Sequence, residues 1–360
     1  MNDRASTIDR PDGIGEILAG VSHLAHQHLR LGWYFMLSRI ASNRASELGF
    51  KSDYKPTRPV PSQRQLMASI TRLLAEDANC VRRGIYPSLP EAADSPIEFL
   101  GRIRAMLDDL PASLARRQER NASTATKAEA SEDPDLPDYF RQDFHFQSGG
   151  YLTEDSARLY DIQVETLFLG TAGPMRRACL APIAEAILGR DQRQLSLLDV
   201  ACGTGRFLRQ VRFAFPRLKL TGLDLSQAYL NEAQRGFHGI KPATWLKANA
   251  ERIPVADASQ DFVTSIFLFH ELPPEARRRV AAEFARVLKP GGRLVFMDSL
   301  QLGDEPEWDG LLEAFPVRFH EPYYRQYTIE DLDALFSSCG LAKIRSRNAF
   351  MSKLMVRQKV

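Results

Sequence analysis

The sequence predicts an α/β fold in which a parallel sheet, covered by helices on both faces, follows a helical N-terminal region. From residue 195 onward, short apolar runs alternate with segments of helical length, which is typical of strands joined by helical crossovers. Before residue 120, apolar residues recur instead at helical spacing. Residues 121–135 separate the two parts, because they contain no large apolar side chain.

The composition narrows the class of protein. The 360 residues are 44% hydrophobic and 26% charged, which excludes full-length disorder and collagen-like or coiled-coil architectures. Lys and Arg number 47 against 45 for Asp and Glu, and a net charge of +2 argues against a protein that mainly coats nucleic acid. No run reaches the roughly 18 apolar residues of a spanning helix, and the polar N-terminus lacks a secretory layout. We therefore expect a cytoplasmic protein.

Cysteine spacing gives no sign of a metal centre or a disulfide framework. The chain has four cysteines, which are far apart and include no CxxC pair: Cys80, Cys179, Cys202 and Cys339. We expect reduced and mostly buried thiols.

Residues 1–120 are expected to form the helical N-terminal region, with helices at residues 14–48, 64–82 and 96–118. In the first helix no acid occurs between His23 and Arg44, and Gly32–Met36 adds aromatic side chains. A basic helix with an aromatic face can lie on a membrane surface, but it can equally pack on its own domain. Peripheral membrane contact through residues 14–48 is thus one of two interpretations.

Three segments follow the helical region. Residues 121–136 are expected to be a linker, because they are rich in small, polar and charged side chains. Residues 137–190 comprise an aromatic stretch and a helical lead-in, with helices at 154–168 and 174–188. Residues 191–360 form the sheet domain, in which strands are expected at 195–200, 218–223, 243–247, 261–267, 293–298 and 341–349.

The central motif joins the first of these strands to the next helix. The strand contains Asp199 and ends in a turn of small residues with Ala201, Gly203 and Gly205, and a helix starts near Arg206. Glycines there let backbone N–H groups approach a ligand closely, and the N-terminus of the following helix is electropositive. Such a loop alone is weak support for any one ligand, because dinucleotide sites use a similar device.

Further motifs follow the later strands. Asp224 ends the second strand about 20 residues beyond the loop, where an acid can bind two ribose hydroxyls. Asn249–Pro254 follows the third strand, and Phe267–His270 ends the fourth. Lys289–Gly292 forms a Pro-Gly-Gly turn before the fifth.

Taken together, these motifs resemble, in order and spacing, the class I S-adenosylmethionine-dependent methyltransferases, and in particular the branch that includes ubiquinone and menaquinone biosynthesis. The resemblance covers residues 150–358. It implies a Rossmann-like sheet of seven strands with the last one antiparallel, and Ala342–Asn348 and Lys353–Gln358 as the final pair. It also implies S-adenosylmethionine as the cofactor. It says little about the acceptor, because this branch methylates many small molecules.

The resemblance assigns the cofactor's amino acid end to the first motif. Asp199 would face that end, while Ala201, Gly203 and Gly205 would leave room for it. This chain departs from the family pattern by having Ala201 where a glycine is common.

The adenosine part is assigned to the later motifs. Asp224 would hold the ribose hydroxyls, and Leu225 would flank the adenine. Asn249 stands where the family usually has Asp, and its side-chain oxygen can accept the same bond from the adenine amino group. Ala250 would offer its backbone N–H to the ring, and Phe267 would line the methyl-donor pocket.

A nicotinamide dinucleotide site is the natural competitor. It requires GxGxxG, but this chain has Arg206 and Phe207 after the second glycine, so the third glycine is missing.

Methyl transfer to a hydroxyl or an acidic carbon requires alignment and a base, and it needs no metal. His270 is a base candidate because it follows the fourth strand, at the edge where doubly wound sheets bind ligands. It can equally support its own loop. His145 in the aromatic stretch and His320 are further candidates.

Aromatic residues are expected to wall the acceptor site. Tyr151 and Tyr160 precede the first motif, where relatives in the family often form a lid, and a second group comprises His320, Tyr323, Tyr324 and Tyr327. We expect a small acceptor, largely apolar and resembling a lipid, a quinone or another natural product, methylated on oxygen or carbon.

Two alternatives stay open: a nucleic-acid or protein methyltransferase, and a non-catalytic module that only binds S-adenosylmethionine. The signature of exocyclic amine methylation is absent from Phe269–Leu272, and Arg277–Arg279 is expected to be a solvated face. Nucleic acid is therefore not an expected partner. Nothing in the sequence indicates an oligomeric state.

Overall fold

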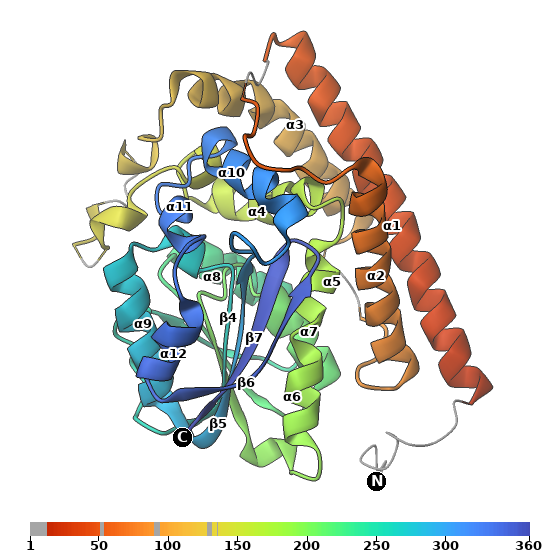
Figure 1. The fold of residues 1–360 in the computed structure, drawn as a ribbon, viewed down its shortest axis with the longest axis vertical. Coiled ribbons are helices and arrows are strands. Elements are labelled where there is room, and N and C mark those ends of the chain that lie inside the picture. The colour runs from red at the N-terminus through yellow and green to blue at the C-terminus, as the bar shows by residue number, and fades with distance from the viewer. Residues whose placement is uncertain (1–12, 51–53, 90–93, 128–131, 135) are drawn as a thin grey trace.

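The computed structural model describes residues 13–50, 54–89, 94–127, 132–134 and 136–360. A seven-stranded sheet lies at its centre, with strand order β3-β2-β1-β4-β5-β7-β6 (Figure 1). Strands β1 to β5 are parallel to one another, whereas β7 is antiparallel to both β5 and β6. This confirms the predicted fold class, including the antiparallel last strand. The strands are β1 (Ser196–Val200), β2 (Lys219–Asp224), β3 (Thr244–Lys247), β4 (Gln260–Ile266), β5 (Leu288–Ser299), β6 (Leu341–Ala349) and β7 (Ser352–Lys359).

Successive strand residues point to opposite faces of the sheet, and each face has its own core. Leu197 and Val295 belong to the core on one face, and their neighbours Leu198 and Phe296 belong to the core on the other. Both faces of the central strands are buried, which explains why a strand such as β1 or β4 is a nearly continuous apolar run. The first face is covered by α6 (Leu180–Ile187), α7 (Arg206–Ala214) and α8 (Gln227–Gly236), the second by α9 (Pro274–Val287) and α12 (Leu332–Ser338).

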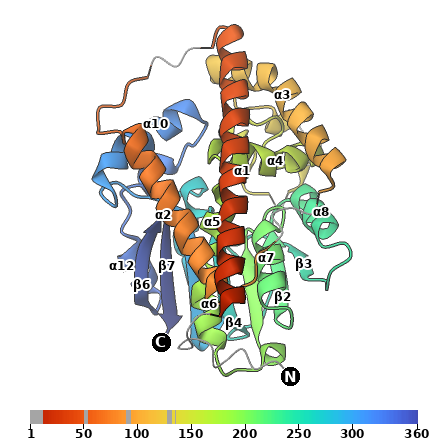
Figure 2. The same ribbon diagram turned by 90° about the vertical axis from the view of Figure 1, so that its right-hand side faces the viewer.

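The N-terminal helices are α1 (Ile14–Glu47), α2 (Gln63–Arg82) and α3 (Pro96–Glu119). α2 lies against the first of these faces and α1 packs beside it, whereas α3 packs on α1 through a separate apolar cluster that contains Tyr34 and Met106. Ser62 and Ser95 begin α2 and α3 with capping boxes, because each hydroxyl accepts a bond from the third backbone N–H of its helix. α2 lies beside α1 and adds its apolar side chains to the same core as α6 and α7 (Figure 2). The helical region and the sheet domain therefore share one core.

The predicted helix at 174–188 is two helices, α5 (Ala172–Arg177) and α6. Pro182 explains the break, because it has no N–H to donate to the carbonyl of Ala178. Before them, α4 (Glu154–Leu167) matches the predicted helix at 154–168. The remaining helices, α10 (Asp309–Arg318) and α11 (Tyr324–Tyr327), follow β5.

The first part of the expected linker packs against the aromatic stretch. The buried carboxylate of Asp143 accepts bonds from the backbone N–H groups of Thr124 (2.9 Å) and Ala125 (2.7 Å). Ala125 is itself fully buried. Composition alone suggests a free linker here, but a single carboxylate holds these residues in place. The domain boundaries stay a prediction.

A buried polar cluster ties α1, α2 and α5 together. The carboxylate of Asp77 accepts two bonds from the Arg177 guanidinium, at 2.8 and 2.6 Å, and one from the Tyr86 hydroxyl at 2.8 Å. A ring nitrogen of His23 lies 2.8 Å from the same carboxylate. Burial alone would favour the neutral acid, but Arg177 and His23 hold the pKa of Asp77 well below its usual range.

We expect Asp77→Asn to lower the free energy of unfolding by about 3–5 kcal/mol, because it leaves the buried Arg177 guanidinium without its counter-charge. Glu76→Gln is the matched control, since Glu76 pairs with Arg347 at the exposed surface, where an ion pair contributes at most about 1 kcal/mol. Urea denaturation of both variants tests this. Equal, small losses would show that the cluster does not hold the helices in place.

Candidate active site

A pocket opens at the carboxyl ends of the central strands, where ligands bind in doubly wound sheets. It is lined by residues of the loops that follow β1, β2, β3 and β4 and by the aromatic stretch before α4. All the cofactor residues expected from the sequence line this pocket except Asp199 and Gly205, and so do Tyr151 and Tyr160 of the expected lid. Their roles toward a ligand stay predictions, but the structure places them around one cavity.

The loop between β1 and α7 forms the floor of the pocket. Its backbone is left-handed at Ala201 (φ 59°), Gly203 (φ 54°) and Gly205 (φ 71°). A Cβ added at Gly205 would come within 3.0 Å of the Ala233 Cβ, so this glycine is required by helix packing. A Cβ at Gly203 would reach only a ring atom of Tyr229, at 4.0 Å, so the space in front of Gly203 is open. Gly203 thus offers exposed backbone to a ligand.

Asp224 fixes this loop to the end of β2. Its carboxylate accepts bonds from the backbone N–H groups of Gly203 (2.8 Å) and Ser226 (2.9 Å). Only 9% of the residue is exposed, and burial raises the pKa of Asp224 to about 6 despite these bonds. A carboxylate held in this way at the edge of a pocket can still accept bonds from ligand hydroxyls, because each oxygen has two lone pairs.

Asp199 lies deeper, within the sheet. It accepts a bond from the Thr264 hydroxyl at 2.6 Å and does not line the pocket. Burial raises the pKa of Asp199 to about 7, and the nearby Asp224 adds to this. The two acids therefore form a pair of buried carboxyls beneath the loop.

Asn249 and Ala250 form the side of the pocket next to β3. The Asn249 Oδ1 accepts the backbone N–H of Glu251 at 2.8 Å, and its Nδ2 donates to the Glu251 carboxylate at 3.2 Å. Tyr139 donates its hydroxyl to the same carboxylate at 2.6 Å. Glu251 and Tyr139 thus orient Asn249, and its Oδ1 has one lone pair left for a ligand.

Aromatic rings close the pocket on the side of α4. Tyr151 stacks on Phe144 with ring centroids 5.4 Å apart, and it meets Tyr229 edge to face at 5.4 Å. Tyr160 meets both Tyr151 and Tyr229 edge to face. The Tyr151 hydroxyl donates to Glu271 at 2.5 Å. The wall is therefore apolar and carries a polar pair, Tyr151–Glu271, at its end.

His270 lies behind this wall and does not line the pocket. Its Nδ1 is 2.5 Å from the buried carboxylate of Asp298. Burial disfavours the cation, yet the attraction of Asp298 raises the pKa of His270 to about 9. The ring therefore keeps its proton at neutral pH, whereas a general base must start without one. Phe267, at the end of β4 with φ 62°, separates its ring from the pocket.

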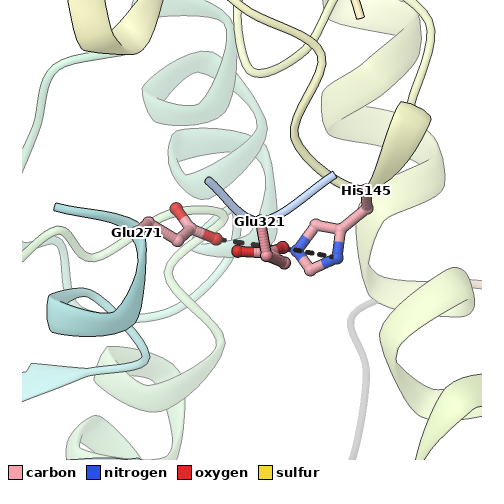
Figure 3. Close-up of side chains that lie close together, drawn as sticks. All are labelled: His145, Glu271 and Glu321. Atoms are coloured by element: carbon pink, nitrogen blue, oxygen red, sulfur yellow. Dashed lines mark ion pairs between the residues drawn. The ribbon is translucent and has the colours of Figure 1, made fainter. Parts of the chain in front are cut away.

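His145 lies in a cluster with Glu271 and Glu321 (Figure 3). Its Nδ1 is 3.0 Å from a Glu321 oxygen and its Nε2 is 3.6 Å from a Glu271 oxygen. Burial disfavours the imidazolium, but these carboxylates raise the pKa of His145 above its usual value. Burial also raises the pKa of Glu321 to about 7.

The other aromatic candidates surround this region without lining the pocket. His320 bonds to the Gln142 side chain at 2.6 Å, away from the pocket. The rings of Tyr324 and Tyr327 pack beside His270 with centroids 5.8 and 6.2 Å away, and both hydroxyls bond to Ser299. Tyr323 contributes a backbone carbonyl that accepts a bond from Arg277.

The expectation that Arg277–Arg279 is a solvated face is wrong for Arg277. This side chain is fully buried and donates to the carbonyls of Phe269 and Tyr323, both at 2.8 Å, and to Glu330. Arg278 and Arg279 are exposed, as expected. A run of like residues on a helix cannot share one environment, because successive side chains point about 100° apart.

The chain matches the family model of a methyltransferase domain over residues 197–292. It is 33% identical over 167 residues to a demethylmenaquinone methyltransferase of Thermotoga maritima, an alignment that covers 46% of this chain and 68% of the relative. The chain belongs to the class I S-adenosylmethionine-dependent methyltransferases, in the ubiquinone and menaquinone branch.

Two other proteins are also similar to this chain. A ubiquinone/menaquinone biosynthesis C-methyltransferase of Desulfotalea psychrophila is 32% identical over 140 residues, which cover 39% of this chain and 53% of the relative. The chain thus spans only about half the length of that relative. The solved structure of human N-acetylserotonin methyltransferase in complex with S-adenosylmethionine is 12% identical. It covers 71% of this chain and 70% of the other, with a TM-score of 0.48.

The pocket fits the cofactor of this family. Gly203 leaves open space at the floor, the Asp224 carboxylate can receive ribose hydroxyls, and Asn249 can accept an adenine amino proton. Leu225 and Ala250 also line the pocket and supply apolar surface. Sequence reasoning missed Tyr139, Tyr229 and Glu251. Tyr139 and Tyr229 reach this site from segments far apart in the chain, which no local pattern predicts. Glu251 lies only two residues after Asn249, but its bond to the distant Tyr139 depends on the complete fold.

We expect Asp224→Ala to weaken the binding of S-adenosylhomocysteine by more than about tenfold, because hydrogen bonds to a charged group are worth roughly 1.5–3 kcal/mol. The affinity of the native protein should also fall about tenfold between pH 8 and pH 5, as Asp224 takes up a proton near pH 6. Isothermal titration calorimetry measures both effects. Asp191→Ala, an exposed acid paired with Arg193, is the control.

Unchanged affinity in Asp224→Ala would place the ribose elsewhere. An affinity independent of pH in the native protein would show that no buried acid of the loop takes part in binding.

Proposed function

We propose that this protein transfers the methyl group of S-adenosylmethionine to a small, largely apolar acceptor, on oxygen or on carbon. The proposal rests on one observation: the cofactor residues and the aromatic wall line the same pocket. Its floor is the β1–α7 loop with Asp224, and its other side is the aromatic wall with Tyr151 and Glu271. A polar nucleotide site thus adjoins a mostly apolar space.

The names of the relatives support this class of acceptor. The Thermotoga and Desulfotalea proteins are named for the methylation of quinones, which combine an aromatic ring bearing oxygens with an apolar tail. A quinone-like ring would match the ring-lined wall of Tyr151, Tyr160 and Tyr229. An oxygen on that ring would find the hydroxyl of Tyr151 and the carboxylate of Glu271 as partners.

The cofactor, when bound, supplies an electrophilic methyl group. The protein's own residues would then do three things. Asp224 and Asn249 would hold the adenosine part, and Gly203 would let the cofactor's amino acid end lie close to the backbone. The aromatic wall excludes water and limits the motion of the acceptor, so that the reacting atoms are aligned. Glu271, which accepts a hydrogen bond from the Tyr151 hydroxyl at 2.5 Å, is the carboxylate on this side of the pocket that would take a proton from the acceptor.

Nucleic acid is a poor match for this pocket, because the charged side chains that line it, Asp224 and Glu271, are both acidic. A non-catalytic module would need no acceptor site next to the cofactor pocket. The wall of tyrosines beside Phe267 therefore favours an enzyme.

The function is tested by calorimetric titration with S-adenosylmethionine, S-adenosylhomocysteine and NADH, followed by acceptor assays. We expect the first two to bind and NADH not to bind. Incubation with S-adenosylmethionine and reduced, short-tailed naphthoquinones should then give a product heavier by one methyl group. Tyr151→Phe should lower kcat while leaving cofactor affinity unchanged, and Tyr54→Phe, whose hydroxyl bonds to the distant Glu313, should change neither.

Binding of the cofactor without turnover on any apolar acceptor would favour the binding module. Binding of NADH in place of the other two would contradict the proposal outright.

The outer face of α1 supports contact with an anionic lipid surface, from which an apolar acceptor could be taken. One side of α1 buries His23, Tyr34 and Leu37 against the rest of the molecule. The other side exposes large apolar residues along its length: Ile14, Leu18, Val21, Leu29, Met36 and Ile40. No acid lies between His23 and Arg44. In the described part of the chain, no helix is long and apolar enough to cross a bilayer.

We expect the protein to co-sediment with vesicles that contain about one third phosphatidylglycerol, and less so at high salt. The triple variant Leu18→Ser, Leu29→Ser, Met36→Ser should lose at least half of this binding, because it removes apolar surface without touching the buried face of α1. The control Ile329→Ser removes an equally exposed apolar side chain elsewhere. Unchanged sedimentation of the triple variant would exclude α1 as the contact.

A further inference from the structure

The cluster of His145, Glu271 and Glu321, here called the His–Glu–Glu cluster, contains a buried carboxylate that no hydrogen bond satisfies. Glu321 is 3% exposed, and neither of its oxygens has a hydrogen-bond partner. The His145 Nδ1 is 3.0 Å away, but its geometry is not that of a hydrogen bond. A buried carboxylate that accepts no hydrogen bond is costly, so it calls for a ligand that stabilises the charge.

Charge in this region is unbalanced toward the negative. Three carboxylates, those of Glu271, Glu321 and Asp298, lie around two imidazoles, those of His145 and His270. Asp298 already binds His270, which leaves Glu271 and Glu321 to share His145. Even with both rings protonated, the three carboxyl groups outnumber the two imidazoles, and burial relieves only part of this excess by raising the pKa of Glu321 to about 7. A positive ligand would remove the excess.

The spacing suits a metal ion. One nitrogen of His145 and one oxygen from each glutamate lie within 4.8 Å of one another, and Figure 3 shows the two carboxylates and the ring gathered at one point. Ligands about 2.0–2.2 Å from a tetrahedral ion are separated by about 3.4 Å. The three side chains would therefore have to close by only about an ångström. The left-handed backbone of His145, with φ 56°, holds its ring in this position.

We propose that the His–Glu–Glu cluster binds a divalent transition-metal ion, such as Zn²⁺ or Mn²⁺. One imidazole with two carboxylates favours these ions over Mg²⁺, which prefers oxygen ligands and water, and over copper(I), which prefers sulfur. Tyr151 donates to Glu271 and so orients one of the ligands, as partners of metal-bound carboxylates commonly do.

The site would connect to the pocket through Glu271. This residue belongs to the cluster and also lines the pocket beside Phe267. Three protein ligands leave at least one coordination position open, which is typical of metal sites that receive a water or a substrate oxygen. The metal site itself does not depend on the proposed methyl transfer, and its test needs no acceptor.

The full-length protein, first treated with a chelator and dialysed, is titrated with zinc, manganese and magnesium chloride by calorimetry. We expect one strong site for zinc and manganese and at least tenfold weaker binding of magnesium. Glu321→Gln and His145→Gln should each weaken the strong site at least tenfold. The control His238→Gln removes an exposed histidine and should leave it intact.

Thermal unfolding distinguishes a metal ligand from a structural ion pair. Without metal, Glu321→Gln should melt no lower than the native protein, because it removes an unsatisfied buried charge. Zinc should raise the melting temperature of the native protein and of His238→Gln, but not of Glu321→Gln. S-adenosylhomocysteine binding, measured in the same samples, should be the same in all of them.

Three results would overturn the proposal. They are the absence of a strong site in the native protein, binding of magnesium as tight as that of zinc, and a lower melting temperature of metal-free Glu321→Gln together with unchanged metal affinity. The last would show that Glu321 serves only as the ionic partner of His145.

Discussion

The carboxylate of Asp224 is the interaction on which the candidate site depends. By accepting the Gly203 N–H at 2.8 Å, it joins the loop after β1 to the end of β2, the neighbouring strand. The loop has a left-handed backbone at three positions, including the non-glycine Ala201, and such a conformation persists only when its surroundings hold it. Asp224 supplies that constraint from one side, and the packing of Gly205 on Ala233 supplies it from the other. The floor of the pocket is therefore fixed before any ligand arrives.

A second constraint connects the helical region to this floor. Asp77 gathers His23, Tyr86 and Arg177 in a buried cluster, and so places α1 and α2 against α5. α5 leads into α6, which covers one face of the sheet. The helical region is thus part of the same core as the sheet. This arrangement leaves one face of α1 outward, where its apolar residues are exposed.

Much of the fold could be predicted because local patterns encode it. The central strands are nearly continuous apolar runs since both of their faces are buried. The ends of the parallel strands bring Asp224, Asn249 and Phe267 to one edge of the sheet. Interactions between distant segments could not be predicted. Arg277 reads as a surface charge, but it is buried because carbonyls of Phe269 and Tyr323 converge on it.

The contacts within the aromatic wall and the His–Glu–Glu cluster also join distant segments, so the sequence does not predict them. His145 comes from the aromatic stretch before α4 and Glu321 from the segment after α10, and only the complete fold brings them to Glu271. The sequence suggested His270 as the base, since it follows β4. Its partner Asp298, on β5, instead keeps the ring protonated, and no pattern near His270 predicts that partner.

The central claim is that the pocket between the β1–α7 loop and the aromatic wall is the cofactor site. A crystal structure with S-adenosylhomocysteine tests it most directly. We expect the ribose hydroxyls within hydrogen-bond distance of the Asp224 carboxylate, the adenine next to Asn249 and Ala250, and the sulfur facing Tyr151 and Phe267. A ligand bound elsewhere, for example in the second pocket lined by Asp94, Asp161 and Arg206, would contradict the account.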